Sequence, residues 1–490
     1  MKNGLLKIGV VFAVIFSYAI AAYCVDDARS YEAILEKYKD VACNAGLKPV
    51  GTPAKKTCVI ENPLSLKKAV ALGLKNNPEV LMAAARIKRA SAMLKRAESA
   101  FYPYVEIYTE YVQGDAPSAF LFKSIDQRKL PEGTDFNHPG WFENFESGVK
   151  AGINLYNGGK DRLKHDMAEL DLELSRLDQK GINNRITEMV IRAFYDALEG
   201  KKFITVATES VETVRSQLRI MEVRFKSGGA LKSDILSLKV RAAASEEALV
   251  RSKNQYWIAI AALAEILGLE PDIDLNLREN TQEAAVVVED VVTATKSAIK
   301  NRPELKSIRK KLIQSEMAVE RARDGYLPRI DIMTRYYHDD PNMQYNANRE
   351  NWTAGIYASW DLFSGFSTKN EVKSAVTNVH EMLAKDRQVL LAIKFDVKKA
   401  YLNYHEAKER LKVAKSGVVM AKETLKLVKR QYEGGSADIT RYLEAELDYN
   451  RARNRETAAF FDREKAVADI SRATGRWAVL IDSTSLTEIK

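Results

Sequence analysis

The sequence contains almost no long hydrophobic run. Of its 490 residues, 29% are charged and 46% are hydrophobic, and the one extended apolar stretch covers residues 8–20. A multi-pass helical membrane protein needs several apolar segments of about 20 residues each, so this class is excluded. Lys2 and Lys7 precede the stretch and small residues follow it, which predicts a secretory signal peptide over residues 1–22. We therefore expect the mature protein to leave the cytoplasm.

Cysteine is scarce too, with three residues in the whole chain. Cys43 and Cys58 flank a short polar loop, so we expect a disulfide between them in an oxidising compartment; two free thiols are the alternative. Cys24 stands where a lipid-anchored protein would carry its acylated cysteine, but the bulky Tyr23 before it argues against lipidation. Residues 23–62 form an N-terminal extension whose function the sequence does not indicate.

Histidines with ligand spacing and the common catalytic motifs are missing as well. The five histidines are not spaced for metal binding, either with each other or with cysteine, so we predict no metal site and no cofactor. Gly158-Gly159-Lys160 lacks the upstream glycine of a phosphate loop. The net charge of +9 is spread along the chain without a compact basic cluster, which argues against nucleic-acid binding. We expect neither an enzyme nor a nucleic-acid-binding protein.

Proline is absent from two long parts of the chain, between Pro139 and Pro271 and after Pro341. Proline costs about 3 kcal/mol inside a helix, so its absence permits very long helices. A helix over about residues 159–226 would be roughly 100 Å long at 1.5 Å per residue. Such a length suits a tube that spans the periplasm better than a globular domain.

Apolar residues then follow a heptad pattern where proline is missing. Between residues 390 and 432 they occur at alternating spacings of three and four, and five alanines from Ala445 to Ala473 recur at every seventh position. This pattern predicts that the two segments pack as coiled-coil helices. Small residues at such a seam let helix axes approach closely.

The chain is internally duplicated. Residues 76–79 (NNPE) recur at 301–304 (NRPE), and residues 225–228 recur at 432–435 with an offset of 207 residues. A longer loop in the first copy, between Gln113 and Asn144, explains why the offset changes. In each copy we predict a helix, a strand, a loop, a strand, a very long helix, a turn and a long helix. The predicted divisions are a first repeat at 64–270, a second repeat at 289–477 and a C-terminal tail at 478–490.

Four segments alternate apolar and polar residues with the period of a β-strand, at about residues 105–111, 145–155, 330–336 and 352–362. Each is about long enough to cross a membrane as a strand. Trp352 and Trp360 are expected on the apolar face at its two ends, where interfacial aromatic residues belong. A soluble sheet with one solvated face is the alternative. Four strands cannot close a wide barrel and open edges are not tolerated in lipid, so several chains must contribute. Three chains would supply twelve strands.

On these features the sequence resembles the TolC family of outer-membrane efflux proteins over about residues 64–477. The motifs that carry the resemblance are LKNNPE (74–79), LYNGGK (155–160), GYLPRID (325–331), LFSGF (362–366) and RQYEGGSADITRYL (430–443). The resemblance implies an α+β membrane protein of the bacterial outer membrane. It would be a homotrimer whose twelve-stranded β-barrel, in outer-membrane lipid, continues into a coiled-coil tunnel in the periplasm. The implied partners are a periplasmic adaptor and an inner-membrane transporter.

The family's tunnel is closed at its periplasmic tip, and the resemblance places a gate there. Glycine permits the chain to reverse direction, so the hairpin turns are expected at Gly228, Gly229, Gly434 and Gly435. The residues that match the family's linking residues are Ser233, Asp234 and Tyr432.

The sequence departs from the family's gate at three positions. Ala437 replaces a linking arginine, while Arg441 and Glu444 stand at two constriction aspartates, so selectivity for cations is in doubt. We hypothesise that Arg441 pairs with Asp234 in a neighbouring hairpin and that Tyr432 and Ser233 add hydrogen bonds. Ordinary solvated tip residues are the alternative.

The predicted function is a passive export duct for multidrug, metal or type I secretion efflux. One alternative is a non-porous periplasmic or surface coiled-coil protein. Another is the adaptor itself, but adaptors carry one coiled-coil hairpin between β-rich modules, whereas this sequence predicts two hairpins.

Overall fold

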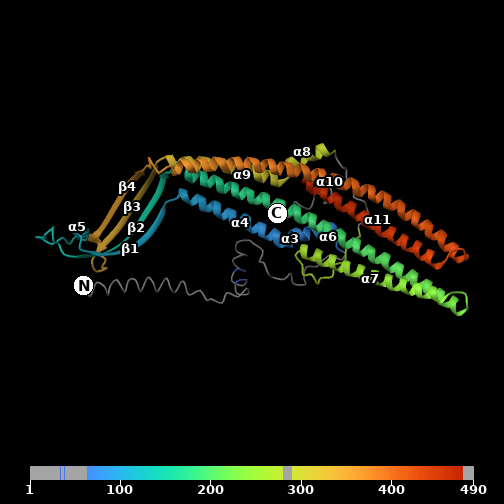
Figure 1. Cartoon of the computed structure of the whole chain (residues 1–490). Helices are drawn as coiled ribbons and strands as arrows, with labels where there is room; N and C mark the ends of the chain where they lie inside the picture. The colour runs from blue at the N-terminus through green and yellow to red at the C-terminus, as the bar shows by residue number, and fades with distance from the viewer. Residues whose placement is uncertain (1–33, 35–37, 39–62, 280–289, 478–490) are drawn as a thin grey trace. The chain divides into compact units, whose positions relative to one another are not determined.

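The computed structural model describes residues 63–279 and 290–477, together with residues 34 and 38 (Figure 1). The chain divides into two units, residues 1–60 and 61–490, and all that follows concerns the second. The expected signal peptide, Cys24, the expected disulfide and the C-terminal tail lie outside the described residues. Within the described part of the chain, no helix is both long and apolar enough to cross a membrane.

The order of helices and strands in the first half of the second unit is the same as in the second half. The first half contains α3 (Leu66–Asn76), α4 (Pro78–Glu98), β1 (Tyr104–Gly114), α5 (Pro117–Asp126), β2 (Phe142–Tyr156), α6 (Lys160–Lys226) and α7 (Lys232–Ile266). The second half contains α8 (Val291–Asn301), α9 (Pro303–Arg323), β3 (Arg329–Asp340), β4 (Glu350–Ser359), α10 (Ser367–Glu433) and α11 (Ile439–Thr474). Helix α5 has no counterpart and occupies the longer loop of the first half.

Two helices, α6 and α10, run for 67 residues each. Their heptad residues are buried where the sequence pattern is strongest: in α10 these include Ile393, Val397, Ala400, Tyr404, Ala407 and Leu411. The five alanines spaced by seven in α11 are all buried as well. The seam therefore supplies apolar contact along these two long helices.

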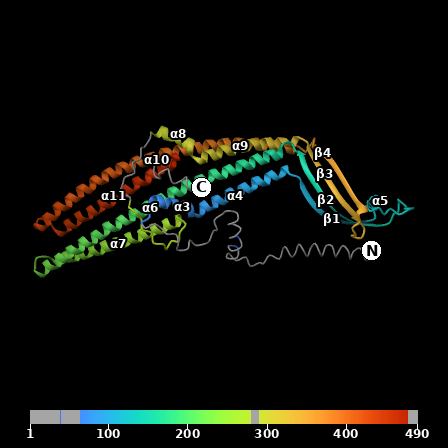
Figure 2. The ribbon, with the colours of Figure 1, turned by 180° about the vertical axis from the view of Figure 1, so that it is seen from behind.

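The long helices pack side by side in the order α7, α6, α11, α10. In the halves of α6 and α10 that lie near the sheet, α4 packs against α6 and α9 packs against α10. In the halves far from the sheet, α7 packs against α6 and α11 packs against α10. The two hairpins α6–α7 and α10–α11 point away from the sheet (Figure 2). Helix α10 is therefore one open edge of a single layer of helices, and the other open edge is α4 near the sheet and α7 in the hairpin half.

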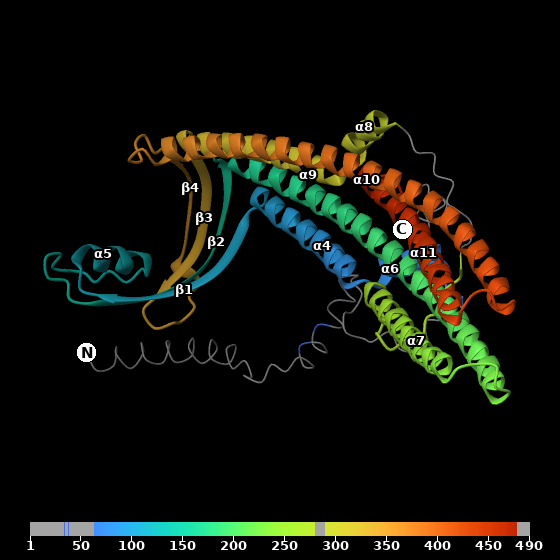
Figure 3. The same cartoon turned by 45° about the vertical axis from the view of Figure 1, so that its right-hand side comes forward.

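The four strands form one antiparallel sheet in the order β1-β2-β3-β4. Register places Glu106, Lys150, Arg335 and Thr353 in one row across the sheet, so their side chains share a face. The sheet lies at one end of the helices, and α5 lies at the end of the sheet that is farther from them (Figure 3). Strands β1 and β4 have no partner on their outer sides within the described chain.

Candidate functional site

One face of the sheet is apolar and bare. Ile107 is 83% exposed and Ile356 is 71% exposed, and Val105 and Trp352 on the same face are also exposed. The opposite face carries ion pairs between neighbouring strands, such as Lys150 with Glu106 at 2.9 Å. A large exposed apolar face marks a surface that meets lipid or another protein.

Strand β4 ends earlier than the sequence predicts. Strand β4 ends at Ser359, because its partner β3 begins at Arg329, directly opposite Ser359. Trp360 follows the strand, and its indole N–H donates to the carbonyl oxygen of Tyr326 at 2.9 Å. Trp352 lies inside the strand, on the apolar face as expected.

Exposed aromatic and large apolar residues gather where the sheet joins the helices. Besides Trp360 they are Tyr102, Tyr326, Leu362, Phe363 and Phe366. Aromatic rings with one polar edge favour the boundary between lipid and water. The sheet therefore has such residues at both ends of its apolar face, with Trp352 towards the far end.

A buried polar cluster occupies the far end of the charged face. The ammonium of Lys123 in α5 lies 2.6 Å from a carboxylate oxygen of Glu146 and 3.0 Å from one of Asp339. Asn144 donates to the same oxygen of Asp339 at 2.5 Å, and Gln127 donates to Asn144 at 2.8 Å. No sequence pattern predicts this cluster, because residues from α5, β2 and β3 meet only in the folded chain.

The opposite end of the molecule carries the two hairpin turns. Gly228 and Gly435 both have φ of +76°, which favours glycine, and each follows the end of a long helix. Gly434 has φ of −84°, and Gly229 is not among the residues with positive φ. Only one glycine of each expected pair is therefore required by the backbone of the turn.

Near these turns the two hairpins share a small core. The rings of Tyr432 in α10 and Tyr442 in α11 stack with centroids 5.5 Å apart, and the guanidinium of Arg224 in α6 lies 5.7 Å from the Tyr432 ring centroid. Burial and the negative charge of Asp234 in α7 raise the pKa of Tyr432. Burial raises the pKa of Tyr442 to about 12. All four long helices thus contribute to one cluster.

The predicted pair between Asp234 and Arg441 does not form within this chain. One carboxylate oxygen of Asp234 accepts a bond from the backbone N–H of Leu231 at 3.3 Å, which caps the start of α7. Ser233 donates to the other oxygen at 3.4 Å. The side chains of Arg441 and Glu444 are exposed and form no ion pair with a described residue. The intrachain contact of Asp234 is with its own helix because α7 begins there.

Sequence reasoning missed Arg224, Tyr442 and Glu446. Tyr442 lies three residues before Ala445, so the heptad phase of α11 could have predicted its burial. Glu446 is 2% exposed, and one of its oxygens accepts bonds from Ser210 at 3.4 Å and Asn450 at 3.2 Å. Its other oxygen has no hydrogen-bond partner among the described residues.

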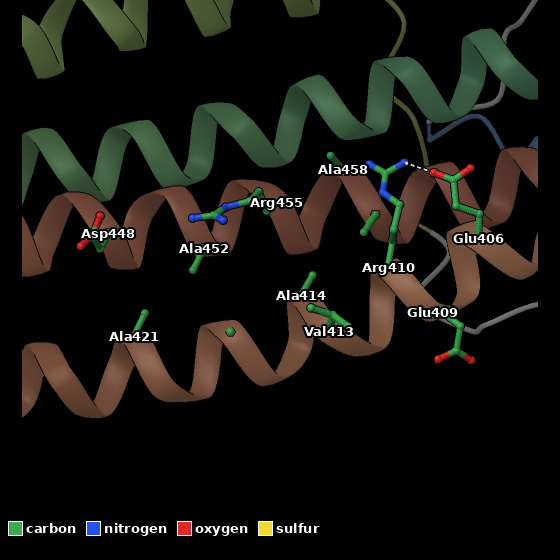
Figure 4. Close-up of a pocket in the computed structure, with 12 residues that line it drawn as sticks. Glu406, Glu409, Arg410, Val413, Ala414, Ala421, Asp448, Ala452, Arg455 and Ala458 are labelled. Atoms are coloured by element: carbon green, nitrogen blue, oxygen red, sulfur yellow. Dashed lines mark ion pairs between the residues drawn. The ribbon is translucent and has the colours of Figure 1, made fainter. Parts of the chain in front are cut away.

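A groove of about 600 Å³ runs between α10 and α11 (Figure 4). Its floor consists of small residues, including Ala414, Gly417, Ala421 and Ala452. Charged residues line its rims: Glu406, Glu409, Arg410, Asp448 and Arg455. A Cβ placed on Gly417 would meet no atom within 4 Å, so the two helices do not close over this part of the seam.

Among the residues that the structure describes, no group of three or more histidine, cysteine, aspartate or glutamate side chains could hold a metal ion. The candidate sites are instead a bare apolar sheet face, one residue cluster at the sheet, another near the hairpin turns, and a groove along one hairpin.

Comparison with known proteins agrees with this geometry. Protein CyaE of Bordetella pertussis is 23% identical over 398 residues, which cover 80% of each chain. The pyoverdine export outer membrane protein OpmQ of Pseudomonas putida is 20% identical and covers 84% of this chain and 85% of its own. The CmeC outer membrane channel of Campylobacter jejuni has the same fold, with a TM-score of 0.69 and 16% identity over 84% of this chain and 85% of its own.

The family assignment rests on the two halves of the chain separately. A family model described as outer membrane efflux protein matches residues 70–269 and 294–476. These two segments hold the helices and strands whose order repeats, and together they make up well over half of the sequence. The chain therefore belongs to the outer membrane efflux protein family.

Proposed function

We propose that three copies of this outer-membrane efflux protein close one twelve-stranded barrel and one tunnel of twelve long helices. The observation that carries this proposal is the sheet, which has a bare apolar face and, within the described chain, two unpaired edge strands, β1 and β4. Lipid offers no hydrogen bonds to such edges, so β4 of one copy must pair with β1 of the next. Four strands per chain then give a barrel only when several chains contribute.

The layer of helices supports the same assembly. Its edge helices carry large apolar residues that nothing covers within the described chain: Leu236, Val240, Val250, Trp257 and Ile258 on α7, and Phe395, Leu402, Val413, Met420 and Leu427 on α10. Several of these are seven residues apart, which is the spacing of a further coiled-coil seam. Packing α10 of one copy against α7 of the next covers both stripes and closes the tube. A non-porous coiled coil would leave the strand edges without partners.

In this assembly cargo passes from the helical tip to the barrel through a water-filled lumen. The charged face of the sheet lines the barrel, and the apolar face with its aromatic ends meets outer-membrane lipid. Transport through this duct requires energy from a partner protein. An inner-membrane transporter supplies it through a periplasmic adaptor, and the helical part spans the periplasm.

The groove between α10 and α11 is the proposed contact for the adaptor. Its floor of small residues and its charged rims suit a partner α-helix, whose side chains enter the floor while polar groups meet the rims. This groove lies between the two helices of one chain's own hairpin, and Val413 of the α10 stripe is also among its lining residues.

Two measurements on the purified protein test the duct. We expect a heat-resistant trimer from the outer-membrane fraction, and ion conductance when that trimer is added to a planar lipid bilayer. A monomer, or a trimer that never conducts even after the tip is opened by mutation, contradicts the proposal. The alternative, a non-porous structural protein, predicts a trimer that never conducts.

A further inference from the structure

Helix α5 lies on the charged face of the sheet. Its Lys123 contacts Glu146 and Asp339, and its last turn brings Gln127 to Asn144. Register places Glu146 and Asp339 in the same row, on the face that also carries the ion pair between β1 and β2. In a single chain these acidic residues are buried, so α5 and its loop cover this end of the face.

Polar residues of α5 face the sheet, and an apolar pair on its opposite side is exposed. It turns Lys123, Ser124 and Gln127 towards the sheet, where Ser124 and Gln127 are buried. Phe122 and Ile125, which are three residues apart, share the opposite side of the helix. Phe122 is 65% exposed and Ile125 is 44% exposed. No described part of the chain covers this apolar pair.

The proposed barrel determines which surroundings Phe122 and Ile125 have in the assembly. The charged face lines the interior, so a helix that covers this face lies inside the mouth, and its far side points towards the axis of the barrel. Lipid cannot reach that space. The other two copies of the chain bring the same helix to the same depth, and threefold symmetry turns the three apolar pairs towards one another.

Resting on the proposed trimeric barrel, we propose that α5 of each copy meets α5 of the other two, and that Phe122 and Ile125 form an apolar constriction at the outer mouth. This constriction is separate from the gate at the helical tip. An apolar ring excludes water and ions when it is narrow. The duct is then restricted at both ends, and Lys123 anchors each helix to the barrel wall.

Cysteine labelling on intact cells tests the constriction. Cys24, Cys43 and Cys58 are replaced by serine, and Tyr357→Cys supplies one thiol on the lumenal face, opposite Asp331 and well below α5. We expect a bulky polyethylene-glycol maleimide to label this thiol only after Phe122→Ser and Ile125→Ser are added. The matched control adds Lys129→Ser and Glu132→Ser, exposed polar residues of the same loop, and should stay unlabelled. Heat-resistant trimers of every variant show that the barrel is intact.

The labelling results distinguish failure of the constriction from failure of the proposed barrel. Bulky reagent that labels Tyr357→Cys equally with and without the apolar pair overturns the constriction and leaves the barrel in place. Failure of a small impermeant maleimide to reach Tyr357→Cys in the variant without the apolar pair overturns the barrel, and the constriction with it.

Direct contact between the helices is tested by cross-linking. In the same background Phe122→Cys should give a reducible dimer band under oxidising conditions, because the thiols of two copies meet at the axis. Ser124→Cys, which faces the sheet of its own chain, should not. Absence of the band from Phe122→Cys, or an equal band from both variants, contradicts the meeting of the three helices.

Discussion

Glu446 is a buried carboxyl group in the core that joins the two hairpins. Burial raises its pKa, although Arg241 in α7 and the bonds from Asn450 and Ser210 oppose the rise. One of its oxygens lacks a partner among the described residues, as does the Nε of Arg241. A buried group of this kind destabilises the fold whenever it is ionised.

The sign of the pH effect follows from this raised pKa. Glu446 ionises more readily in the unfolded chain, so the stability it gives is fully present below the unfolded pKa and is lost as pH rises through the folded one. Each pKa unit that separates the two states corresponds to about 1.4 kcal/mol in the free energy of unfolding. We expect Glu446→Gln to match the parent near pH 4 and to exceed it in stability at pH 8. Urea unfolding of the detergent-solubilised protein across this pH range measures the difference.

The matched control for this prediction is Asp448→Asn, two residues away and exposed. It removes the same charge from the same helix without changing a buried group. A parallel change in the stability of both variants, or a Glu446→Gln difference that does not grow with pH, contradicts the role of burial.

At the scale of single elements, consecutive residues of β4 lie on opposite faces of the sheet. Ile356 lies on the exposed apolar face and its neighbour Tyr357 on the charged face. We expect Ile356→Arg to destabilise the assembled trimer by about 2–4 kcal/mol per site if it lies near the bilayer midplane. Tyr357→Arg should be tolerated because it enters the lumen. The temperature at which the trimer dissociates on a gel measures both, and equal tolerance contradicts the barrel.

The groove on the α10–α11 hairpin gives a second prediction for an element. Ala421→Leu places a larger side chain on its floor, which lies between helices that do not close there. We expect weaker binding of the adaptor and reduced export, with the heat resistance of the trimer unchanged. Lys422→Leu, at the exposed neighbouring position, is the control. Loss of the trimer by Ala421→Leu would instead place a neighbouring copy of the chain in the groove.

Periodicity explains which elements could be predicted from the sequence. The heptads of α10 and α11 and the alternation of β1 to β4 repeat over many residues. Each pattern therefore predicts both the type of secondary structure and its apolar face. Strand β4 was predicted to extend to about residue 362 but ends at Ser359, because the end of a strand depends on where its partner begins. Helix α5 was missed because its ten residues sit in a loop and its polar side, not its apolar side, packs on the sheet.

For the whole molecule, contacts between chains are the part that one sequence reveals least. The apolar edges of α7 and α10 and the edges of the sheet are uncovered within the described chain, and the proposed trimer covers them. The tip cluster of Arg224, Tyr432 and Tyr442 joins the hairpins of one chain. It leaves Arg441 exposed and without an ion pair among the described residues.

The last prediction concerns this link between copies. In the closed tube α7 of one copy lies beside the α10–α11 hairpin of the next, and Asp234 and Arg441 each lie six residues beyond the glycine with positive φ in their turns. We propose that they pair across the interface. A partly solvated pair contributes about 0.2–1 kcal/mol, and three such pairs make a latch that an adaptor can break.

In the Phe122→Ser and Ile125→Ser background, which lacks the proposed constriction at the outer mouth, Arg441→Ala should therefore raise single-channel conductance and admit large antibiotics through the duct. Asp234→Asn should do the same, and it is preferred to alanine because its amide oxygen can still accept the bond from Leu231 that caps α7. The double variant should add nothing to either single change, because both remove one interaction. Lys232→Ala, an exposed neighbour of Asp234, should conduct like the parent. If both single variants also conduct like the parent, the tip is closed by the packing of Tyr432 and Tyr442 alone.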